Sequence, residues 1–357
     1  MEEAMNTFET RFEIGGLTLG NRGAAPILIA ETACAHDGSA DEAMRLVDAS
    51  VAAGADMVQL QVFRAAEQVP PGHKLRGLLE RIALSDDDWS KVFRHAAGGG
   101  KEVMAFVYDI PSLDVALANG VVALKLNSAD LLNRPLLSAC AESGLPIFLG
   151  TGASTLEEIA KSLSCISEHG GRKVILMHGV QDFPTALSDA RIDRIRLLRE
   201  TFGLPVGYGD HTDATLPISR IIDLMAIGLG AQVLEKHITM DRSEGKPDHQ
   251  AALHPDEWKL YAETVRTAAS GLSTSAPVEL TEADRRYRRF QKKFAVAART
   301  ISKGEAVNDD SVRFLRLEED GEISAIDFAG MGKVIARRDL APYEVIRNAD
   351  LCCADQE

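Results

Sequence analysis

The chain has 357 residues, of which 45% are hydrophobic and 26% are charged, a globular composition with enough apolar residues for a large core. At this length we expect one large domain and a smaller one. Asp and Glu outnumber Lys and Arg by 53 to 39, and the net charge of −14 argues against a surface that binds nucleic acid or an anionic membrane.

The apolar segments and the cysteines lead us to expect a cytoplasmic protein. The longest apolar runs have about ten residues, too few to cross the roughly 30 Å of hydrocarbon in a bilayer. The first residues are acidic and polar, without the apolar segment of a secretion signal. The five Cys residues show no CxxC spacing and are odd in number, which is typical of a reducing compartment.

Short apolar runs rich in β-branched residues alternate with segments of helical periodicity over the first three quarters of the chain. The predicted strands are Pro26–Glu31, Met57–Val62, Val103–Val107, Val122–Leu126, Pro146–Gly150, Lys173–Met177, Pro205–Tyr208 and Val233–Lys236. The predicted helices between them include Ala40–Ala53, Pro135–Glu142, Leu156–Ser167, Ile192–Thr201 and Pro217–Ile227. This α/β alternation favours a closed (β/α)₈ TIM barrel over an open doubly wound sheet.

Further elements flank the barrel sequence on both sides. Arg11–Gly20 contains a Gly-Gly pair between two apolar triplets, a pattern typical of a β-hairpin, which we expect to close the N-terminal end of the barrel. A last helix is predicted from about Trp258 to Ser270, and a segment rich in Ser, Gly and Pro follows it.

The texture of the sequence changes again after this segment. A basic run, Arg285–Lys293, is interpreted as the solvated face of a linker, and short β-type runs with a weak internal repeat follow from Phe294. We therefore predict a barrel with its hairpin in residues 1–272, a linker in residues 273–292 and a small β-rich domain in residues 293–357.

Polar side chains collect at the C-terminal ends of the predicted strands, where active sites form in barrels of this kind. The alternation of the last strand places Glu235 and His237 on one face and Lys236 on the other. Closure makes this strand the neighbour of the strand before His211 and of the strand that ends in Glu31. We therefore expect Glu31, His211, Glu235 and His237 to converge at the barrel mouth.

These residue types suit a metal-assisted reaction. Two imidazoles with open coordination positions fit Mn²⁺ or a similar divalent ion acting as a Lewis acid, and two carboxylates are available for proton transfer. Lys125, near Ser128, is interpreted as an anion site, with a snorkelling surface lysine as the alternative. His36 and His178 are left open between a role in the site and a role in packing.

Taken in order, these positions resemble the N-acetylneuraminate (sialic acid) synthase family. The matching segments are Ile29–Glu31, His36–Gly38, Lys125–Ser128, Asn133–Leu137, Thr151–Thr155, Gly207–Thr212, Glu235–His237 and Pro247–His249. Near the C-terminus, Ile301–Asp310 and Gly332–Leu351 resemble the antifreeze-like (SAF) domain that follows the barrel in this family. The resemblance covers nearly the whole chain.

The resemblance implies an enzyme that condenses phosphoenolpyruvate with an N-acetylated hexosamine to give a nine-carbon 2-keto-3-deoxy acid and phosphate. It implies that His211 and His237 hold a divalent metal, Mn²⁺ or Mg²⁺, which polarises the sugar aldehyde. It also implies that Glu31 and Glu235 are the catalytic residues, which orient the aldehyde and activate the water. Which glutamate has which of these two roles is left open.

The resemblance also carries over the substrate-binding positions and the partner. It implies that Gln61, Lys125 and Ser128 hold phosphoenolpyruvate and that Asp248 contacts sugar hydroxyls. The other candidate substrate-binding residues are Thr151, Gln181 and Asp210. Arg316 is the nearest match to an arginine of the antifreeze-like domain that reaches into the partner subunit's site, which implies a domain-swapped homodimer.

The chain departs from the family pattern at substrate-binding positions. Gln59 stands where the family usually has Lys, Gly150 and Gly209 where it has Ser, and Gln181 and Phe183 where it has Asn or Ser and Tyr. Loss of one charge-assisted hydrogen bond costs on the order of 1.5–3 kcal/mol. We therefore expect an altered acceptor sugar. The alternatives are a different 2-oxo-acid donor on the same scaffold, and a non-catalytic sugar-binding or scaffolding protein.

Overall fold

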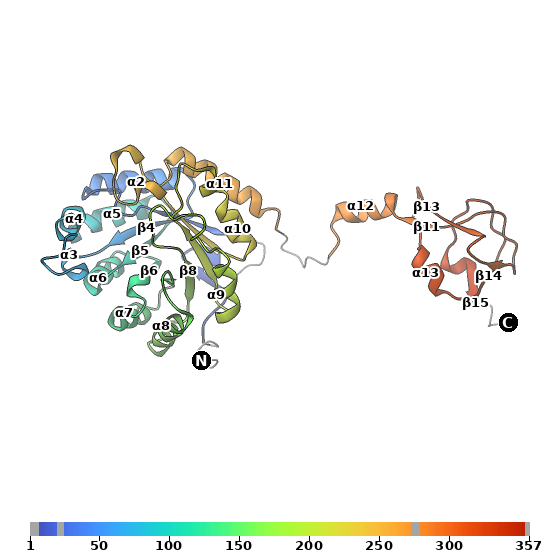
Figure 1. The fold of residues 1–357 in the computed structure, drawn as a ribbon, viewed down its shortest axis with the longest axis horizontal. Coiled ribbons are helices and arrows are strands. Elements are labelled where there is room, and N and C mark those ends of the chain that lie inside the picture. The colour runs from blue at the N-terminus through green and yellow to red at the C-terminus, as the bar shows by residue number, and fades with distance from the viewer. Residues whose placement is uncertain (1–6, 20–24, 273–278, 354–357) are drawn as a thin grey trace. The chain divides into compact units, whose positions relative to one another are not determined.

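The computed structural model describes residues 7–19, 25–272 and 279–353 (Figure 1). The chain divides into two compact units, residues 1–274 and 275–357. Residues 273–278 of the predicted linker lie outside the described residues. In the part of the chain that the structure describes, no helix has the length and apolar character needed to cross a bilayer.

The first unit is a closed barrel of parallel strands, in the order β10-β3-β4-β5-β6-β7-β8-β9. The strands are β3 (Ile27–Glu31), β4 (Met57–Val62), β5 (Glu102–Val107), β6 (Ala123–Leu126), β7 (Ile147–Gly150), β8 (Val174–His178), β9 (Val206–Asp210) and β10 (Val233–His237). They nearly coincide with the predicted strands, and β10 pairs with β3 to close the cylinder. The predicted (β/α)₈ barrel is confirmed.

Helices surround these strands (Figure 1). They are α2 (Ala40–Ala52), α3 (Ala65–Gln68), α4 (Arg76–Ile82), α5 (Asp86–Gly98), α6 (Ile110–Ala118), α7 (Arg134–Glu142), α8 (Leu156–Glu168), α9 (Arg194–Phe202), α10 (Ile222–Gly228) and α11 (Pro255–Ala269). Short 3₁₀ helices are η1 (Ser128–Asp130), η2 (Pro217–Arg220), η3 (Arg242–Glu244) and η4 (His249–Ala251). The predicted helix Pro217–Ile227 is thus divided into η2 and α10. Where it is divided, the Ser219 carbonyl accepts a hydrogen bond from the buried Lys236 ammonium.

Local sequence explains where helices such as α8 begin. The Thr155 hydroxyl accepts a hydrogen bond from the Glu158 N–H, and the Glu158 carboxylate accepts one from the Thr155 N–H. This capping box satisfies amide groups that have no partner within the helix. The apolar stripe of α8, which includes Ile159, Leu163 and Ile166, is buried against the strands.

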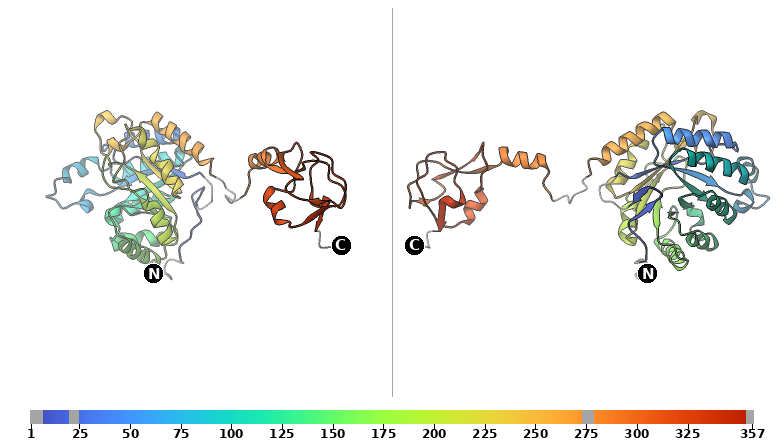
Figure 2. Two further views of the ribbon diagram at one scale, coloured as in Figure 1. Left: turned by 45° about the vertical axis from the view of Figure 1, so that its right-hand side comes forward. Right: turned by 180° about the vertical axis from the view of Figure 1, so that it is seen from behind.

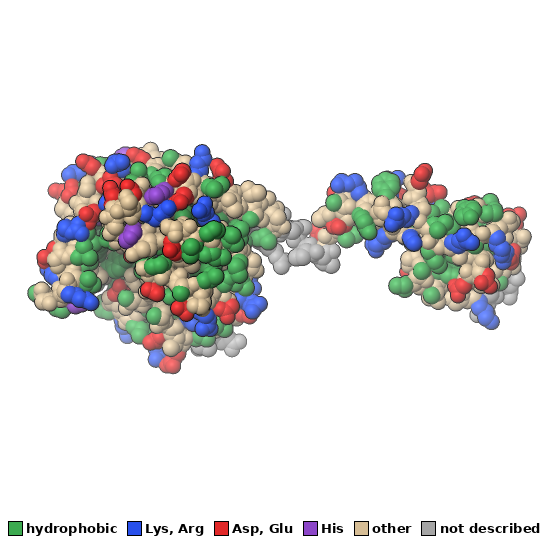
Figure 3. All heavy atoms as spheres, turned by 45° about the horizontal axis from the view of Figure 1, so that its top comes forward, with side chains coloured by type: hydrophobic (Ala, Val, Ile, Leu, Met, Phe, Trp, Pro, Cys, Tyr) green, Lys and Arg blue, Asp and Glu red, His purple; other side chains and the backbone are tan. Residues whose placement is uncertain are grey.

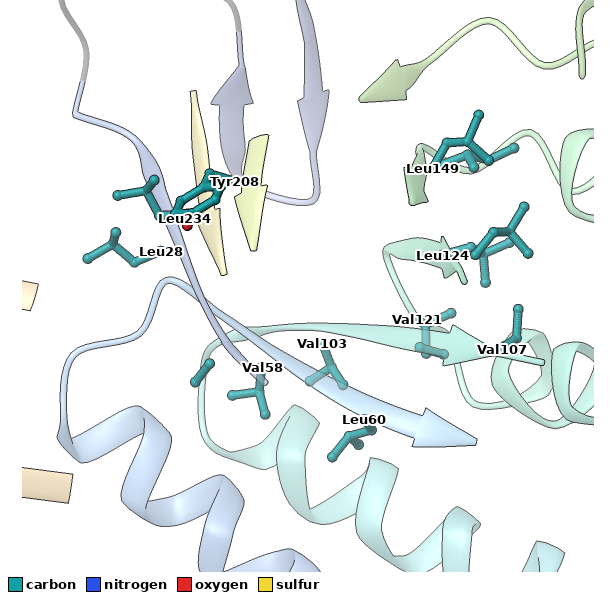
Figure 4. Close-up of a cluster of buried hydrophobic side chains, with 14 of the residues drawn as sticks. Leu28, Val58, Leu60, Val103, Val107, Val121, Leu124, Leu149, Tyr208 and Leu234 are labelled. Carbon is teal, nitrogen blue, oxygen red and sulfur yellow. The ribbon is translucent and has the colours of Figure 1, made fainter. Parts of the chain in front are cut away.

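Two apolar layers, one on each face of the barrel sheet, hold the first unit together. The layer between strands and helices is drawn in Figure 4 and includes Leu28, Val58, Leu60, Leu124, Tyr208 and Leu234. The layer inside the barrel includes Ile29, Met57, Met104, Phe148, Ile175 and Val233. Successive side chains of a strand point to opposite faces, so each strand contributes to both layers.

The N-terminal hairpin closes the barrel at the N-terminal ends of its strands. It consists of β1 (Phe12–Ile14) and β2 (Leu17–Leu19), and its apolar side chains join the layer inside the barrel. The Gly16 N–H donates to Glu102 Oε1 at 2.7 Å, at the first residue of β5. The expected position of the hairpin is confirmed. The hairpin is drawn in dark blue in the right-hand view of Figure 2.

The second unit is small and rich in β-structure. Its elements are α12 (Glu282–Gln291), β11 (Lys293–Ala297), β12 (Ala306–Val307), β13 (Val312–Arg316), α13 (Ala325–Gly330), β14 (Val334–Ala336), η5 (Asn348–Asp350) and β15 (Leu351–Cys353). Strands β11 and β13 form one antiparallel sheet, and β12, β14 and β15 form another. The basic run belongs largely to α12, so this part of the predicted linker is helical. Every residue of α12 is exposed, and the basic side chains are solvated as expected.

The weak internal repeat of the second unit corresponds to two matching turns. In one, Glu305 accepts from the Ser302 N–H at 2.9 Å and pairs with Arg299 at 2.6 Å. In the other, Glu344 accepts from the Ala341 N–H at 2.7 Å and pairs with Arg338 at 2.6 Å. The same local sequence pattern therefore forms the same turn twice.

Candidate active site

A cavity of about 190 Å³ opens at the C-terminal ends of the barrel strands. Its lining residues are Glu31, Gln61, Phe106, Tyr108, Lys125, Asn127, Gln181, Phe183, His211, Glu235, His237 and Asp248. The four residues expected to converge at the barrel mouth are all among them. Gln61, Lys125, Gln181 and Asp248, from the predicted substrate-binding set, also line the cavity.

Strand register explains why these side chains meet. Glu31 of β3 and His237 of β10 are directly paired, as are Gln61 of β4 and Phe106 of β5. Phe106 is in turn paired with Lys125 of β6. Paired residues on neighbouring strands have side chains on the same face of the sheet, and here that face is the barrel interior.

The two histidines lie next to each other and are buried. Their ring centroids are 5.2 Å apart, with an angle of 75° between the planes. Nδ1 of His211 lies 2.6 Å from the Val180 carbonyl oxygen. A carbonyl only accepts, so this contact assigns the proton of His211 to Nδ1 and leaves a lone pair on Nε2. Burial lowers the pKa of both His211 and His237, which favours the neutral imidazoles that bind metals.

These imidazoles and their surroundings fit a divalent cation that completes its coordination with water or substrate. His237 Nδ1, Glu31 Oε2 and Glu235 Oε2 are buried and have no hydrogen-bond partner. His237 Nε2 lies 3.9 Å from Asp248 Oδ2. Within the described ranges, no three His, Cys, Asp or Glu side chains form a complete metal-binding group.

The two glutamates have different environments. Glu31 Oε1 accepts a hydrogen bond from the Ala33 N–H at 2.8 Å. Burial, reinforced by the nearby Glu235 carboxylate, raises the pKa of Glu31 to about 8. Glu235 Oε1 instead forms an ion pair with the Lys125 ammonium. Thus Glu31 holds a proton at neutral pH, while Glu235 has a cationic partner.

Lys125 is a buried cation inside the barrel and not a surface lysine. Its side chain is 10% exposed, and its ammonium lies 4.5 Å from the centroid of the Phe106 ring. The carboxylates that line the cavity belong to Glu31, Glu235 and Asp248, whereas Lys125 is the one lysine or arginine in the described lining. An anionic substrate therefore meets a single cation, and that cation is already paired with Glu235.

Several predicted site residues lie outside the cavity lining. Ser128 begins η1 and is half-buried, with its hydroxyl 3.4 Å from Asn127 Oδ1. The buried Thr151 hydroxyl donates to the Met177 carbonyl at 3.0 Å. Arg316 is exposed on β13 of the second unit.

Asp210, predicted as substrate-binding, is also absent from the lining. It is fully buried and forms an ion pair with Lys236. Because His211 faces the cavity, the alternation of the chain turns the preceding residue toward the helices.

The departures from the family pattern have different structural settings. A Cβ on Gly150 would lie 2.7 Å from Ser128 N and 2.9 Å from the Leu126 carbonyl oxygen, so the backbone leaves no room for serine. A Cβ on Gly209 would lie 3.5 Å from Glu235 Oε1, an ordinary contact. Gln59 is fully buried beside Glu31 in the strand register, and neither polar atom of its amide has a partner.

The two histidines whose role the sequence left open, His36 and His178, are buried in packed surroundings. His36 Nδ1 accepts from the Gly38 N–H at 3.1 Å, and the ring meets Trp89 edge to face at 5.7 Å. His178 Nε2 lies 2.9 Å from the Ala190 carbonyl oxygen, and its ring stacks on Tyr208 at 5.8 Å. Neither residue lines the cavity.

Sequence reasoning placed Phe183 at a substrate-binding position of the family, but it did not predict that Phe106 and Tyr108 line the cavity. Phe183 lies 4.3 Å from His211 and 5.8 Å from His237, centroid to centroid. Phe106 and Tyr108 stack at 4.5 Å on the opposite wall. The alternation of side chains along β5 places Phe106 inside the barrel, and Tyr108 follows two residues later on the same face. This pattern was the sequence signal that could have identified Phe106 and Tyr108.

Comparisons with known proteins place this chain among sugar-acid synthases. The model of the NeuB family matches residues 46–276. The chain is 29% identical over 307 residues to N,N'-diacetyllegionaminic acid synthase of Legionella pneumophila, covering 81% of this chain and 85% of the relative. It is 27% identical over 305 residues to pseudaminic acid synthase of Campylobacter jejuni, covering 81% and 86%.

A solved structure with the same fold leads to the same family. The N-acetylneuraminic acid (sialic acid) synthetase of Leptospira borgpetersenii, in complex with citrate, superposes with a TM-score of 0.72 at 25% identity. The match covers 78% of this chain and 96% of that one. With a family model that matches more than half of its length and a barrel of the same architecture, this chain belongs to the NeuB family.

Proposed function

We propose that this protein is a metal-dependent synthase that condenses phosphoenolpyruvate with the aldehyde of an N-acetylated hexosamine-type sugar. The products are a sialic-acid-like 2-keto-3-deoxy sugar acid and phosphate. The observation that carries the proposal is the buried pair of neutral imidazoles beside two glutamates in different environments.

His211 and His237 would hold Mn²⁺ or Mg²⁺, which supplies Lewis-acid polarisation of the aldehyde oxygen when bound. C3 of phosphoenolpyruvate attacks the aldehyde carbon, and Glu31, whose pKa is raised by burial, gives a proton to the oxygen that becomes a hydroxyl.

Water then adds to C2, and its proton passes to a carboxylate of the site. Glu235 Oε2, which has no partner, is available for it. The tetrahedral carbon then expels phosphate, and the proton of the new hydroxyl passes to the departing phosphate as that oxygen becomes the keto oxygen. Lys125 holds an anionic group of the donor.

The direct test is phosphate release in the presence of phosphoenolpyruvate, Mn²⁺ and a panel of N-acetylated hexosamines, with the product mass measured in parallel. Glu235→Gln is the matched control, because it keeps the side-chain shape and removes the charge that pairs with Lys125. We expect turnover with at least one sugar and none for the variant. No turnover with any acceptor at high phosphoenolpyruvate would reject this donor.

The charge of the lining supports a second candidate function, in which a 2-oxo acid without phosphate replaces phosphoenolpyruvate. The lining holds one lysine and three acidic side chains, of which Glu31 retains its proton at neutral pH, and Gln59 adds no positive charge. A thermal-shift screen separates the two candidates. Stabilisation by a 2-oxo acid but not by phosphoenolpyruvate would favour the second.

We also propose that Arg316 completes the site of a partner subunit in a homodimer. Arg316→Ala and His237→Ala should each be inactive alone. Subunits exchanged between these two variants should regain activity, because one barrel then keeps its histidines and receives an intact arginine. No recovery in a mixed dimer would reject the shared site.

A further inference from the structure

A buried ion cluster lies directly behind the two histidines of the cavity. Asp210 of β9 precedes His211, Lys236 of β10 precedes His237, and the two charged residues are paired in the strand register. Both are fully buried. Because neighbouring residues of a strand face opposite sides, the imidazoles line the cavity while this ion pair lies between the barrel and its helices.

The Lys236 ammonium connects four elements. Its three protons have three acceptors, which are the Asp210 carboxylate, the Ser219 carbonyl of η2 and Asp223 Oδ2 of α10 at 2.9 Å. The ammonium also lies 5.3 Å from the centroid of the Tyr261 ring of α11. The donor capacity of this lysine is therefore fully used, which fixes the position of its side chain.

The Asp210 carboxylate binds residues on both sides of His211 in the chain. Oδ1 accepts from the Thr212 N–H and from the Tyr208 hydroxyl, each at 3.1 Å. Oδ2 accepts from the Thr212 hydroxyl at 2.8 Å, in addition to its bond with Lys236. His211 thus stands between two residues that one carboxylate ties together.

Stability alone is a weak reason for such a cluster. Burying an ammonium and carboxylates costs desolvation free energy. A protein in which well-packed apolar residues of similar volume replace such groups is often as stable or more stable. Hydrogen bonds are directional, whereas apolar packing is not. The hydrogen bonds of this cluster therefore fix the position of β9 relative to β10 at the level of the imidazoles.

We propose that Lys236, Asp210 and Asp223 are positioning residues that set the separation of the His211 and His237 imidazoles for a shared divalent cation. The inference rests on the proposed function only in taking these histidines as the metal ligands. Groups that hydrogen-bond directly to the ligands of a metal typically change its affinity by 10- to 100-fold when they are removed, and this cluster acts on the ligands through the strands that carry them.

The test is the Mn²⁺ affinity of the full chain, measured by electron paramagnetic resonance of the free ion, together with thermal unfolding. Lys236→Met keeps the length of the side chain and removes its charge. Arg266→Met is the matched control, because Arg266 Nη2 pairs with Asp56 Oδ1 at 2.8 Å, next to the first residue of β4 and at the opposite end of the strands from the histidines.

We expect Lys236→Met to weaken Mn²⁺ binding by roughly 10- to 100-fold and Arg266→Met to leave it unchanged while lowering the unfolding temperature. Asp223→Asn, which keeps the shape of the side chain, should weaken binding in the same direction, and it serves if Lys236→Met does not fold. Wild-type affinity in either folded cluster variant would overturn the positioning role, as would equal weakening in Arg266→Met.

Two results separate the positioning role of the cluster from the metal role of the histidines. A wild-type chain that binds Mn²⁺ and turns over substrate, with unchanged affinity in the cluster variants, refutes only the positioning role. A wild-type chain that binds no Mn²⁺ overturns the metal role of the histidines and the positioning role with it.

Discussion

Glu31→Gln should change how the stability of the barrel depends on pH. Glu31 is 1% exposed, and burial together with the nearby Glu235 raises its pKa from 4.5 to about 8. The folded state therefore retains a proton that the unfolded state loses near pH 4.5. The stability that this proton contributes is complete below about pH 4.5 and is lost as the pH rises through about 8.

The size of the effect follows from the same two values. Between about pH 4.5 and 8, the free energy of unfolding should fall by roughly 1.4 kcal/mol per pH unit on account of this group, or by roughly 5 kcal/mol in all. The glutamine side chain of the variant does not titrate, so this contribution disappears. Relative to the wild type, Glu31→Gln should therefore gain stability steadily from pH 5 to 8, and the gain should level off above pH 8.

Urea unfolding of metal-free wild type and Glu31→Gln at a series of pH values between 5 and 9 measures the difference. Glu13→Gln is the control, because Glu13 is exposed on the hairpin and its removal should leave the profile parallel to the wild type. Parallel profiles for Glu31→Gln and wild type would refute the reasoning, since Glu31 would then titrate alike in the folded and unfolded states.

Gly150→Ser should destabilise the protein by about 1–3 kcal/mol through backbone overlap, whereas Gly209→Ser should stay near wild-type stability in urea unfolding, because its Cβ has room. Thr155→Ala should cost about 1 kcal/mol through loss of the α8 cap, with no change in Mn²⁺ affinity by calorimetry. Lys125→Met should weaken phosphoenolpyruvate binding by roughly 10- to 100-fold through loss of a charge-assisted bond, measured by titration calorimetry, and an unchanged affinity would place the anion elsewhere.

The charge pattern has a visible counterpart in the structure. Acidic and basic side chains are interspersed over the face of the first unit turned to the viewer in Figure 3. Inside the cavity the balance is different, because a single lysine lies among three acidic side chains, of which Glu31 retains its proton at neutral pH. The global charge of −14 therefore says little about the site, where individual partners decide what an anion meets.

The convergence of Glu31, His211, Glu235 and His237 was predictable because it needs only two rules. Alternation gives the face of each side chain, and closure of the barrel makes β10 the neighbour of β3 and β9. The same alternation also places Asp210 on the face opposite His211, so its absence from the cavity lining was implicit in the sequence. The alternation alone did not reveal that Phe106 and Tyr108 line the cavity, since apolar residues inside a barrel are usually core.

The sequence by itself determined the order of strands and helices, the hairpin, the two-part chain and the group of four polar residues. These follow from local periodicity and from the chain order of the strands, which are present before any contact forms. Only the tertiary structure decided which charges pair. Lys125 binds Glu235 and Lys236 binds Asp210 and Asp223, and each pair joins residues from different elements. Burial and distance select such partners, and both arise only when the barrel has closed.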